Sequence, residues 1–154
     1  MTLEKTLRQQ LNDPEAGGFH VSHDGWNVTL TAEKRDSMSC ALNELALERD
    51  DPIREELHPW AVRVAERVTG LIEALRVIEV DQPIGKALLR SAAPTVRDGK
   101  SFYYELILER TARTSAHLRR YAGDRIGGDK REPVTFVLTH DAIVKLVADI
   151  AGTK

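Results

Sequence analysis

Short runs in which every second residue is apolar recur along this chain, and they limit its possible folds more than any other feature. One such run extends from Trp26 to Ala32 in GWNVTLTAEK, and another from Phe102 to Leu108 in SFYYELILER. Successive side chains of a β-strand point to opposite faces, so each run predicts a strand with one buried face and one face open to solvent.

Turn signals beside these runs predict that the strands are antiparallel. Asp24-Gly25 precedes the first run and predicts a hairpin whose other strand is Phe19–Ser22, and Asp98-Gly99 marks the tip of a second hairpin. Asp-Gly suits the tight turns that join antiparallel neighbours. Weaker patterns predict further strands at Arg76–Val80, Lys86–Pro94, Ser115–Gly123 and Pro133–Thr139.

The segment Ser39–Arg49 fits either a helix or a strand that slips by one residue near Asn43. An internal comparison decides between them. ELALER at Glu44–Arg49 is similar to ELILER at Glu105–Arg110, and an Arg-Asp pair precedes each by a few residues. Because the second copy has the strand pattern, we interpret Ser39–Arg49 as a strand with a bulge near Asn43. The match also predicts two related hairpins.

Three segments repeat apolar residues at helical spacing. They are residues 2–12, residues 57–75 with Pro59 at the first helical position, and the segment after Thr139. The first is short and must dock its leucines, on its own sheet or, as the alternative, on a partner subunit. Short antiparallel strands with helices at the start, middle and end of the chain predict an α+β fold, an antiparallel sheet with N-terminal, central and C-terminal helices packed on it.

The sequence Thr139-His140-Asp141 joins the last strand to the last helix. Thr139 suits the N-cap of that helix and Asp141 its first turn, where the helix dipole favours a negative charge. Capping therefore explains both residues without chemistry, and we interpret His140 as an exposed residue. The alternative is a metal or proton-transfer site. It would need further ligands, and the other histidines lack ligand spacing: His20, His23, His58 and His117.

Composition is that of one soluble domain over residues 1–154. The formal charge is −2, and aromatic residues make up only 5% of the chain, so nucleic acid is not the expected partner. Cys40 is the single cysteine, and we interpret it as a buried apolar residue. The N-terminus lacks the apolar core of a signal peptide, so we expect a cytoplasmic protein with no membrane partner. No motif indicates a cofactor or a metal.

Six residues are candidates for binding. Trp26 and Trp60 are the two large anchors; packing in the core is the favoured interpretation, and an interface hot spot is the alternative. His117, Arg119 and Tyr121 on one strand, together with His140, form the candidate pocket of a small-ligand binder or an enzyme, provided that the strand ending at Thr139 is a neighbour.

Five arginines lie between residues 110 and 125, and they support RNA binding as a further hypothesis. They could bind RNA through phosphate contacts, with Tyr121 stacking on a base. The favoured interpretation is a hairpin at the edge of the sheet, protected by charge against pairing with another strand. The residues are Arg110, Arg113, Arg119, Arg120 and Arg125.

The order helix, three strands, helix, further strands, helix resembles that of the class I type III secretion chaperones. The resemblance implies a small cytoplasmic α+β protein that forms a homodimer and holds an extended segment of another protein. It covers most of the chain, although the second half holds more strands than that family has. We therefore expect a non-enzymatic, chaperone-like or adaptor-like protein-binding module. A small-ligand site beneath the sheet and RNA binding are the alternatives.

Overall fold

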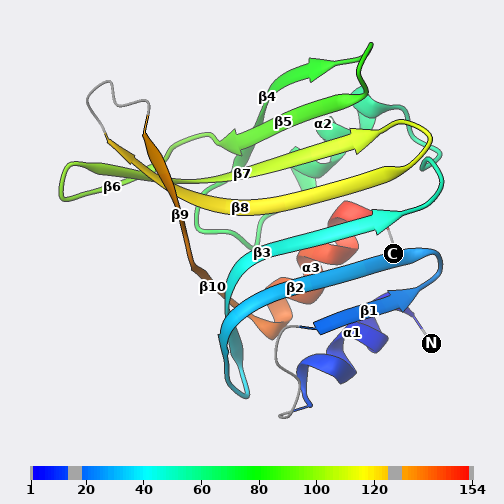
Figure 1. Ribbon diagram of the computed structural model, residues 1–154, viewed down its shortest axis with the longest axis horizontal. Helices are drawn as coiled ribbons and strands as arrows, with labels where there is room; N and C mark the ends of the chain where they lie inside the picture. The colour runs from blue at the N-terminus through cyan, green and yellow to red at the C-terminus, as the bar shows by residue number, and fades with distance from the viewer. Residues whose placement is uncertain (1, 14–18, 125–129, 153–154) are drawn as a thin grey trace.

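The computed structural model describes residues 2–13, 19–124 and 130–152. Within these residues ten strands form one antiparallel sheet and three helices pack on it (Figure 1), which confirms the α+β fold predicted from the sequence. The strands follow the order β1-β2-β3-β8-β7-β5-β4, with β10 beside β3, β6 beside β7 and β9 beside β8.

The elements have the following bounds. The helices are α1 (Leu3–Leu11), α2 (Leu57–Arg67) and α3 (His140–Ala151). The strands are β1 (Phe19–His23), β2 (Trp26–Arg35), β3 (Ser39–Arg49), β4 (Leu75–Asp81), β5 (Lys86–Ser91), β6 (Thr95–Arg97), β7 (Lys100–Arg110), β8 (Thr114–Asp124), β9 (Arg131–Val134) and β10 (Phe136–Thr139).

All three helices lie on one side of the sheet, behind it in the view of Figure 1. Helix α1 packs against α3 and β1, and α2 packs against β4, β5 and β7. The leucines of α1 are at most 2% exposed, so this helix buries its apolar face within its own domain and not against a partner subunit. The core lies between the helices and the sheet, and none of the helices in the described residues covers the opposite face of the sheet.

The tight hairpins form where the sequence predicts them. Asp24 and Gly25 have φ of 52° and 82°, and Asp98 and Gly99 have φ of 51° and 75°. Two successive residues of positive φ are the signature of the type I′ turn, which Asp-Gly adopts readily. The bulge near Asn43 is also confirmed, because β2 pairs with the residues on either side of Asn43 and passes over it.

Helix α2 is shorter than predicted. It ends at Arg67 because Val68 adopts an extended backbone, and Leu75 already belongs to β4. The helical spacing continues past Arg67 because Val68 and Leu71 still fill the core from an irregular segment. Gly70 lies close to α3 there, because a Cβ atom placed on Gly70 would lie 3.7 Å from Cβ of Ala142. The segment after Arg67 thus contributes to the core without being helical.

The predicted strand Pro133–Thr139 is two strands. β9 pairs with β8 and β10 pairs with β3, and Thr135 separates them. The position of the arginine-rich hairpin also differs from the prediction. β8 lies between β3 and β7 in the middle of the sheet, so an edge position cannot explain its charges.

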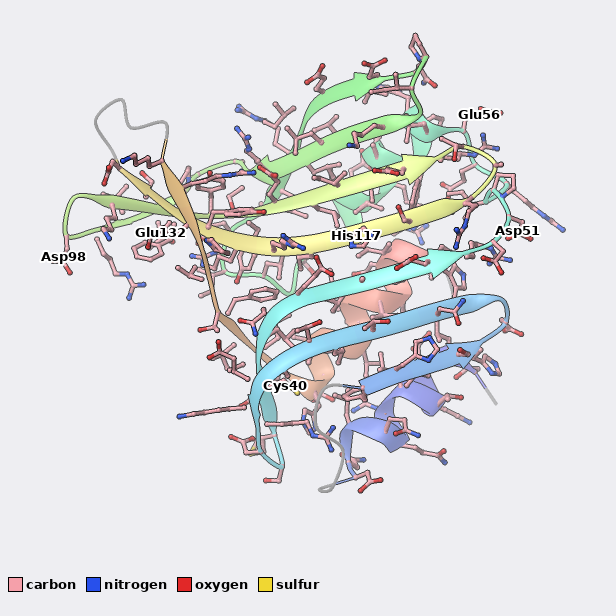
Figure 2. The ribbon with its side chains drawn as sticks, viewed as in Figure 1. Cys40, Asp51, Glu56, Asp98, His117 and Glu132 are labelled. Carbon is pink, nitrogen blue, oxygen red and sulfur yellow. The ribbon has the colours of Figure 1, made fainter. Side chains whose placement is uncertain are left out.

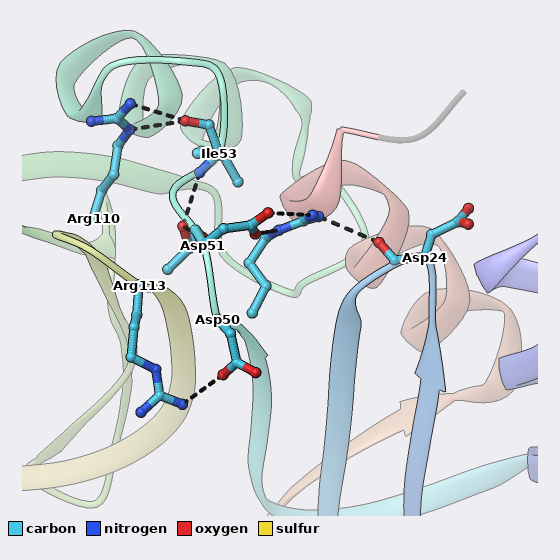
Figure 3. Close-up of polar contacts among 8 residues, drawn as sticks. Asp24, Asp50, Asp51, Ile53, Arg110 and Arg113 are labelled. Carbon is cyan, nitrogen blue, oxygen red and sulfur yellow. Dashed lines mark hydrogen bonds and ion pairs between the residues drawn. The ribbon is translucent and has the colours of Figure 1, made fainter.

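Arginines also fix the connection from β3 to α2, as Figure 3 shows. Arg110 donates two hydrogen bonds to the carbonyl oxygen of Ile53, at 3.0 and 3.1 Å, and Arg113 pairs with Asp50 at 3.1 Å. The hydroxyl of Thr114 accepts from the Ile53 N–H, so the connection is held to the start of β8. No helix in the described part of the chain is both long and apolar enough to cross a bilayer.

Candidate functional site

The register of the strands brings a row of side chains together on the uncovered face. His117 of β8 lies opposite Ala46 of β3 and opposite Ile107 of β7, and Ile107 lies opposite Leu88 of β5. Paired residues point to the same face of a sheet, so these four share a face. Figure 2 shows His117 on β8 with the helices on the far side of the sheet.

Two adjoining hollows lie along this row. The first, here called the His117 hollow, has a volume of about 260 Å³ and is lined by Glu44, Lys86, Glu105, Ile107, Glu109, His117, Arg119 and Tyr121. The second, the Leu88 hollow, has a volume of about 200 Å³ and is lined by Glu79, Asp81, Ile84, Lys86, Leu88, Glu105 and Ile107. They share three residues, so together they form one shallow groove across β3, β8, β7, β5 and β4.

Charges in the His117 hollow are paired. Glu44 accepts a hydrogen bond from Nε of Arg119 at 2.5 Å and lies 3.5 Å from Nδ1 of His117. The hydrogen bond with Glu44 raises the pKa of Arg119. Lys86 pairs with Glu109 at 3.5 Å. A ligand in this hollow therefore meets a nearly neutral surface with an imidazole in it.

Glu105 forms the fixed centre of the groove. It is only 4% exposed, and it accepts hydrogen bonds from Arg90 at 2.9 Å and from Arg131 at 2.6 and 3.2 Å. Burial alone would raise the pKa of this carboxyl group, but the two guanidinium groups outweigh it and lower the pKa. Arg131 also lies 3.8 Å above the ring of Tyr121. The charge of Glu105 is therefore offset by two arginines of the protein itself.

The Leu88 hollow is more apolar. Leu88 and Ile107 are half-buried there, while Ile84 is 60% exposed. Glu79 and Asp81 stand on its rim, and neither makes an ion pair with another described residue. An apolar surface with carboxylates that lack a counter-ion is suited to a ligand that brings both apolar atoms and a positive charge.

Three of the six candidate residues from the sequence meet in the groove. His117, Arg119 and Tyr121 all line the His117 hollow. His140 does not, because β10 pairs with β3 rather than with β8. The expectation that His140 is exposed is also wrong: it is 6% exposed at the start of α3, and its Nε2 atom has no hydrogen-bond partner among the residues described.

Both tryptophans lie in the core. Trp26 is 4% exposed with the guanidinium of Arg49 above its ring at 5.0 Å, and Trp60 is fully buried. Nε1 of Trp60 donates to the carbonyl oxygen of Ile150 at 3.0 Å, which ties α2 to the last turn of α3. These contacts agree with the interpretation as core residues.

Capping at Thr139 is confirmed. Its hydroxyl oxygen accepts from the Ala142 N–H at 3.1 Å, and Asp141 in the first turn pairs with Arg8 of α1. In the described parts of the chain no group of His, Cys, Asp and Glu side chains has the arrangement of a metal site.

The arginines proposed for RNA already have partners within the protein. Arg119 pairs with Glu44, Arg120 is buried against Glu73, and Arg110 and Arg113 hold the β3–α2 connection. Arg125 lies outside the described residues. A patch whose cations are offset in this way offers less attraction to phosphates than the sequence suggests.

A larger hollow lies beside the end of α3, but its polar groups serve the fold. Its volume is about 640 Å³. Arg63 fills part of it, donates to the carbonyl oxygens of Asp149 and Ile150, and pairs with Glu55 at 2.7 Å. Arg63 thus satisfies the free carbonyl groups that end a helix, which is a structural role.

The apolar residues of the groove were not predicted as a site. Leu88 and Ile107 each stand inside a run of three apolar residues, ALL at 87–89 and LIL at 106–108. A strand with one solvated face should alternate, so an uninterrupted run signals apolar residues on both faces. Ala46 in LAL at 45–47 carries the same signal.

Comparison of the chain with protein-family models, with curated proteins and with solved structures gives no match.

Proposed function

We propose that this protein is a non-enzymatic binding module that holds an extended segment of another protein on the uncovered face of its sheet. The observation that carries the proposal is the groove itself. The described helices cover one face only, and the groove on the other face crosses five strands and has an apolar floor at Leu88 of β5 and Ile107 of β7. Apolar surface in a groove with a polar rim is typical of an interaction site.

Photo-crosslinking tests this proposal. A benzoylphenylalanine in place of Ile84, which is 60% exposed at the groove, should form a covalent adduct with a defined protein in cells of the source organism. The control places the same probe at Gln9, an exposed residue of α1 on the helix side. Adducts at Ile84 alone support the proposal. Equal adducts at both positions, or none at Ile84, contradict it.

The resemblance to class I type III secretion chaperones adds two parts to the proposal. The module is a cytoplasmic homodimer, and its role is chaperone-like or adaptor-like. Light scattering coupled to size exclusion should then give twice the 17.2 kDa of one chain. A mass of one chain at every concentration tested would contradict the homodimer, and the proposal of binding in the groove would stand.

Binding of a small ligand is the second candidate function, because His117, Arg119 and Tyr121 converge in one hollow. Glu44 beside Nδ1 of His117 could orient the imidazole. The test adds a protein-free extract of the source organism and follows imidazole resonances by NMR. A shift at His117 without one at the exposed His58 supports this candidate, and unchanged resonances contradict it.

A further inference from the structure

We propose that the segment held in the groove presents a basic residue beside an apolar one, and that Glu79 and Asp81 bind the basic residue while the Leu88 hollow takes the apolar one. This inference rests on the proposed function and adds the chemistry of the partner.

Exposed apolar side chains occur along β4, and one of them lines the groove. Six large hydrophobic residues are exposed in the part of the chain that the structure describes. Three of them are isoleucines on β4 or in the segments on either side of it: Ile72, Ile78 and Ile84. Ile84 lines the Leu88 hollow directly. Ile84 therefore adds exposed apolar surface to the hollow, where a partner can cover it.

The carboxylates of the groove divide into two groups. Glu44, Glu105 and Glu109 each pair with an arginine or a lysine of the same face. Glu79 and Asp81 have no such cation among the described residues, since Lys86, which lies opposite Asp81, pairs with Glu109 instead. The negative charge that remains unpaired in the groove is therefore at its β4 end, where a cation of the partner would form an ion pair with it.

A bulge in β4 puts these carboxylates on the uncovered face. Val77 pairs with Leu89 and Glu79 pairs with Leu88, so Ile78 is an extra residue in the strand. Without it, Glu79 would follow the alternation from Val77 and point to the helix side. A bulge also hinders pairing of another strand along a sheet edge. The partner therefore lies on the face of the sheet rather than adding a strand beside β4.

Fluorescence anisotropy with designed peptides tests the inference. The probe is a fluorescein-labelled peptide in which leucines and lysines are separated by serine and glycine. Two matched peptides replace every lysine by glutamate or every leucine by serine. We expect the parent peptide to bind, binding to weaken with salt, and both matched peptides to bind at least about tenfold more weakly.

Protein variants locate the binding. Glu79→Lys should weaken the parent peptide about fivefold or more, while Glu66→Lys, the same charge change at an exposed position of α2, should leave the affinity within about twofold. Ile84→Ser should weaken it as well, because the apolar contact is lost. Equal losses for Glu79→Lys and Glu66→Lys would overturn the inference, since only general charge attraction would remain. So would equal binding of the glutamate peptide.

The outcomes separate this inference from the proposed function. Adducts at Ile84 in cells, with no preference for the lysine peptide, would overturn the choice of a basic partner and leave the binding module standing. The reverse result is peptide binding that depends on Glu79 without adducts at Ile84 in cells. It would support the proposed chemistry of the Leu88 hollow and contradict the proposal that the protein binds its partner there.

Discussion

Arg120 of β8 donates two parallel hydrogen bonds to Glu73, one to each carboxylate oxygen and each 2.9 Å long, with both side chains buried beneath the sheet. Ser91 and Thr95 donate to the same carboxylate at 2.8 and 2.6 Å, and the guanidinium lies 4.3 Å above the ring of Tyr104. The irregular segment after α2 is thereby fixed to three strands of the sheet.

Removing one partner of this pair should destabilise the fold strongly. Arg120→Met leaves a buried carboxylate without its counter-ion, and we expect a loss of about 3–5 kcal/mol in the free energy of unfolding. Arg119→Met, at the preceding residue of the strand, breaks a solvent-accessible ion pair with Glu44 and should cost about 1 kcal/mol or less. Urea unfolding measures both, and equal losses would refute the distinction. The double variant Glu73→Leu/Arg120→Met should be more stable than Arg120→Met alone.

Acid should weaken the fold through Glu73 and Glu105. Burial acts to raise the pKa of both carboxyl groups, but their hydrogen bonds with arginines prevail and lower it from the ordinary 4.5. A lowered folded-state pKa gives stability that is fully present above the unfolded pKa. That stability is lost as the pH falls through the folded pKa. The free energy of unfolding should thus be steady from pH 7 to about 5 and decline below about 4.5.

Unfolding in urea at a series of pH values checks this dependence. Glu105→Gln removes one of the two groups, so its stability should decline less steeply below about pH 4.5 than that of the unchanged protein. Glu66→Gln, on the surface of α2, is the control and should keep the original slope. A slope that Glu105→Gln leaves unchanged would contradict the assignment to Glu105.

Loss of the α3 cap should cost a moderate amount of stability. Thr139→Ala removes the acceptor of the Ala142 N–H, and we expect a loss of about 1 kcal/mol in the free energy of unfolding. Thr139→Ser keeps the hydroxyl and should therefore keep most of the stability that Thr139→Ala loses. Thr135→Ala changes an exposed threonine between β9 and β10 and serves as the control. If Thr139→Ala and Thr135→Ala are equally stable, the cap contributes nothing.

Cys40 should react slowly with thiol reagents while the protein is folded. It is 1% exposed, and burial raises the pKa of its thiol. Because the thiolate is the reactive form, little modification by Ellman's reagent is expected at pH 8 until urea unfolds the chain. Ser37→Cys, which adds a thiol at an exposed neighbouring position, should react at once and by one equivalent. Rapid reaction of the unchanged protein would contradict the burial.

Local signals in the sequence were sufficient for much of the fold. The Asp-Gly turns and the threonine cap depend on a few adjacent residues, and each is as predicted. The bulge at Asn43 is also as predicted, although the choice of a strand there required comparison with Glu105–Arg110. The end of α2 was predicted too late in the chain, because Val68 and Leu71 keep the helical spacing although they fill the core from irregular backbone. The break at Thr135 was missed for the same reason, since the alternation runs through it.

The groove could be predicted only in part. His117, Arg119 and Tyr121 alternate on one strand, so the sequence alone places them on one face. Their meeting with Leu88 and Glu79 depends on the register of β4, β5 and β7, which single-strand patterns do not contain. The bulge at Ile78 decides which way Glu79 points, and nothing in LRVIEVD marks it.

The pairing of β10 with the first half of β3 has a consequence for biosynthesis. Leu42 pairs with Ala32 of β2 on one side, but its partner on the other side is Phe136, and the indole N–H of Trp60 donates to Ile150. Neither contact exists until the ribosome has translated these late residues, so the domain cannot complete its core while it is being made. Contacts between residues so distant in the chain also slow folding. This edge of β3 therefore stays unpaired through most of the chain's synthesis, and unpaired strand edges make a folding chain prone to aggregation.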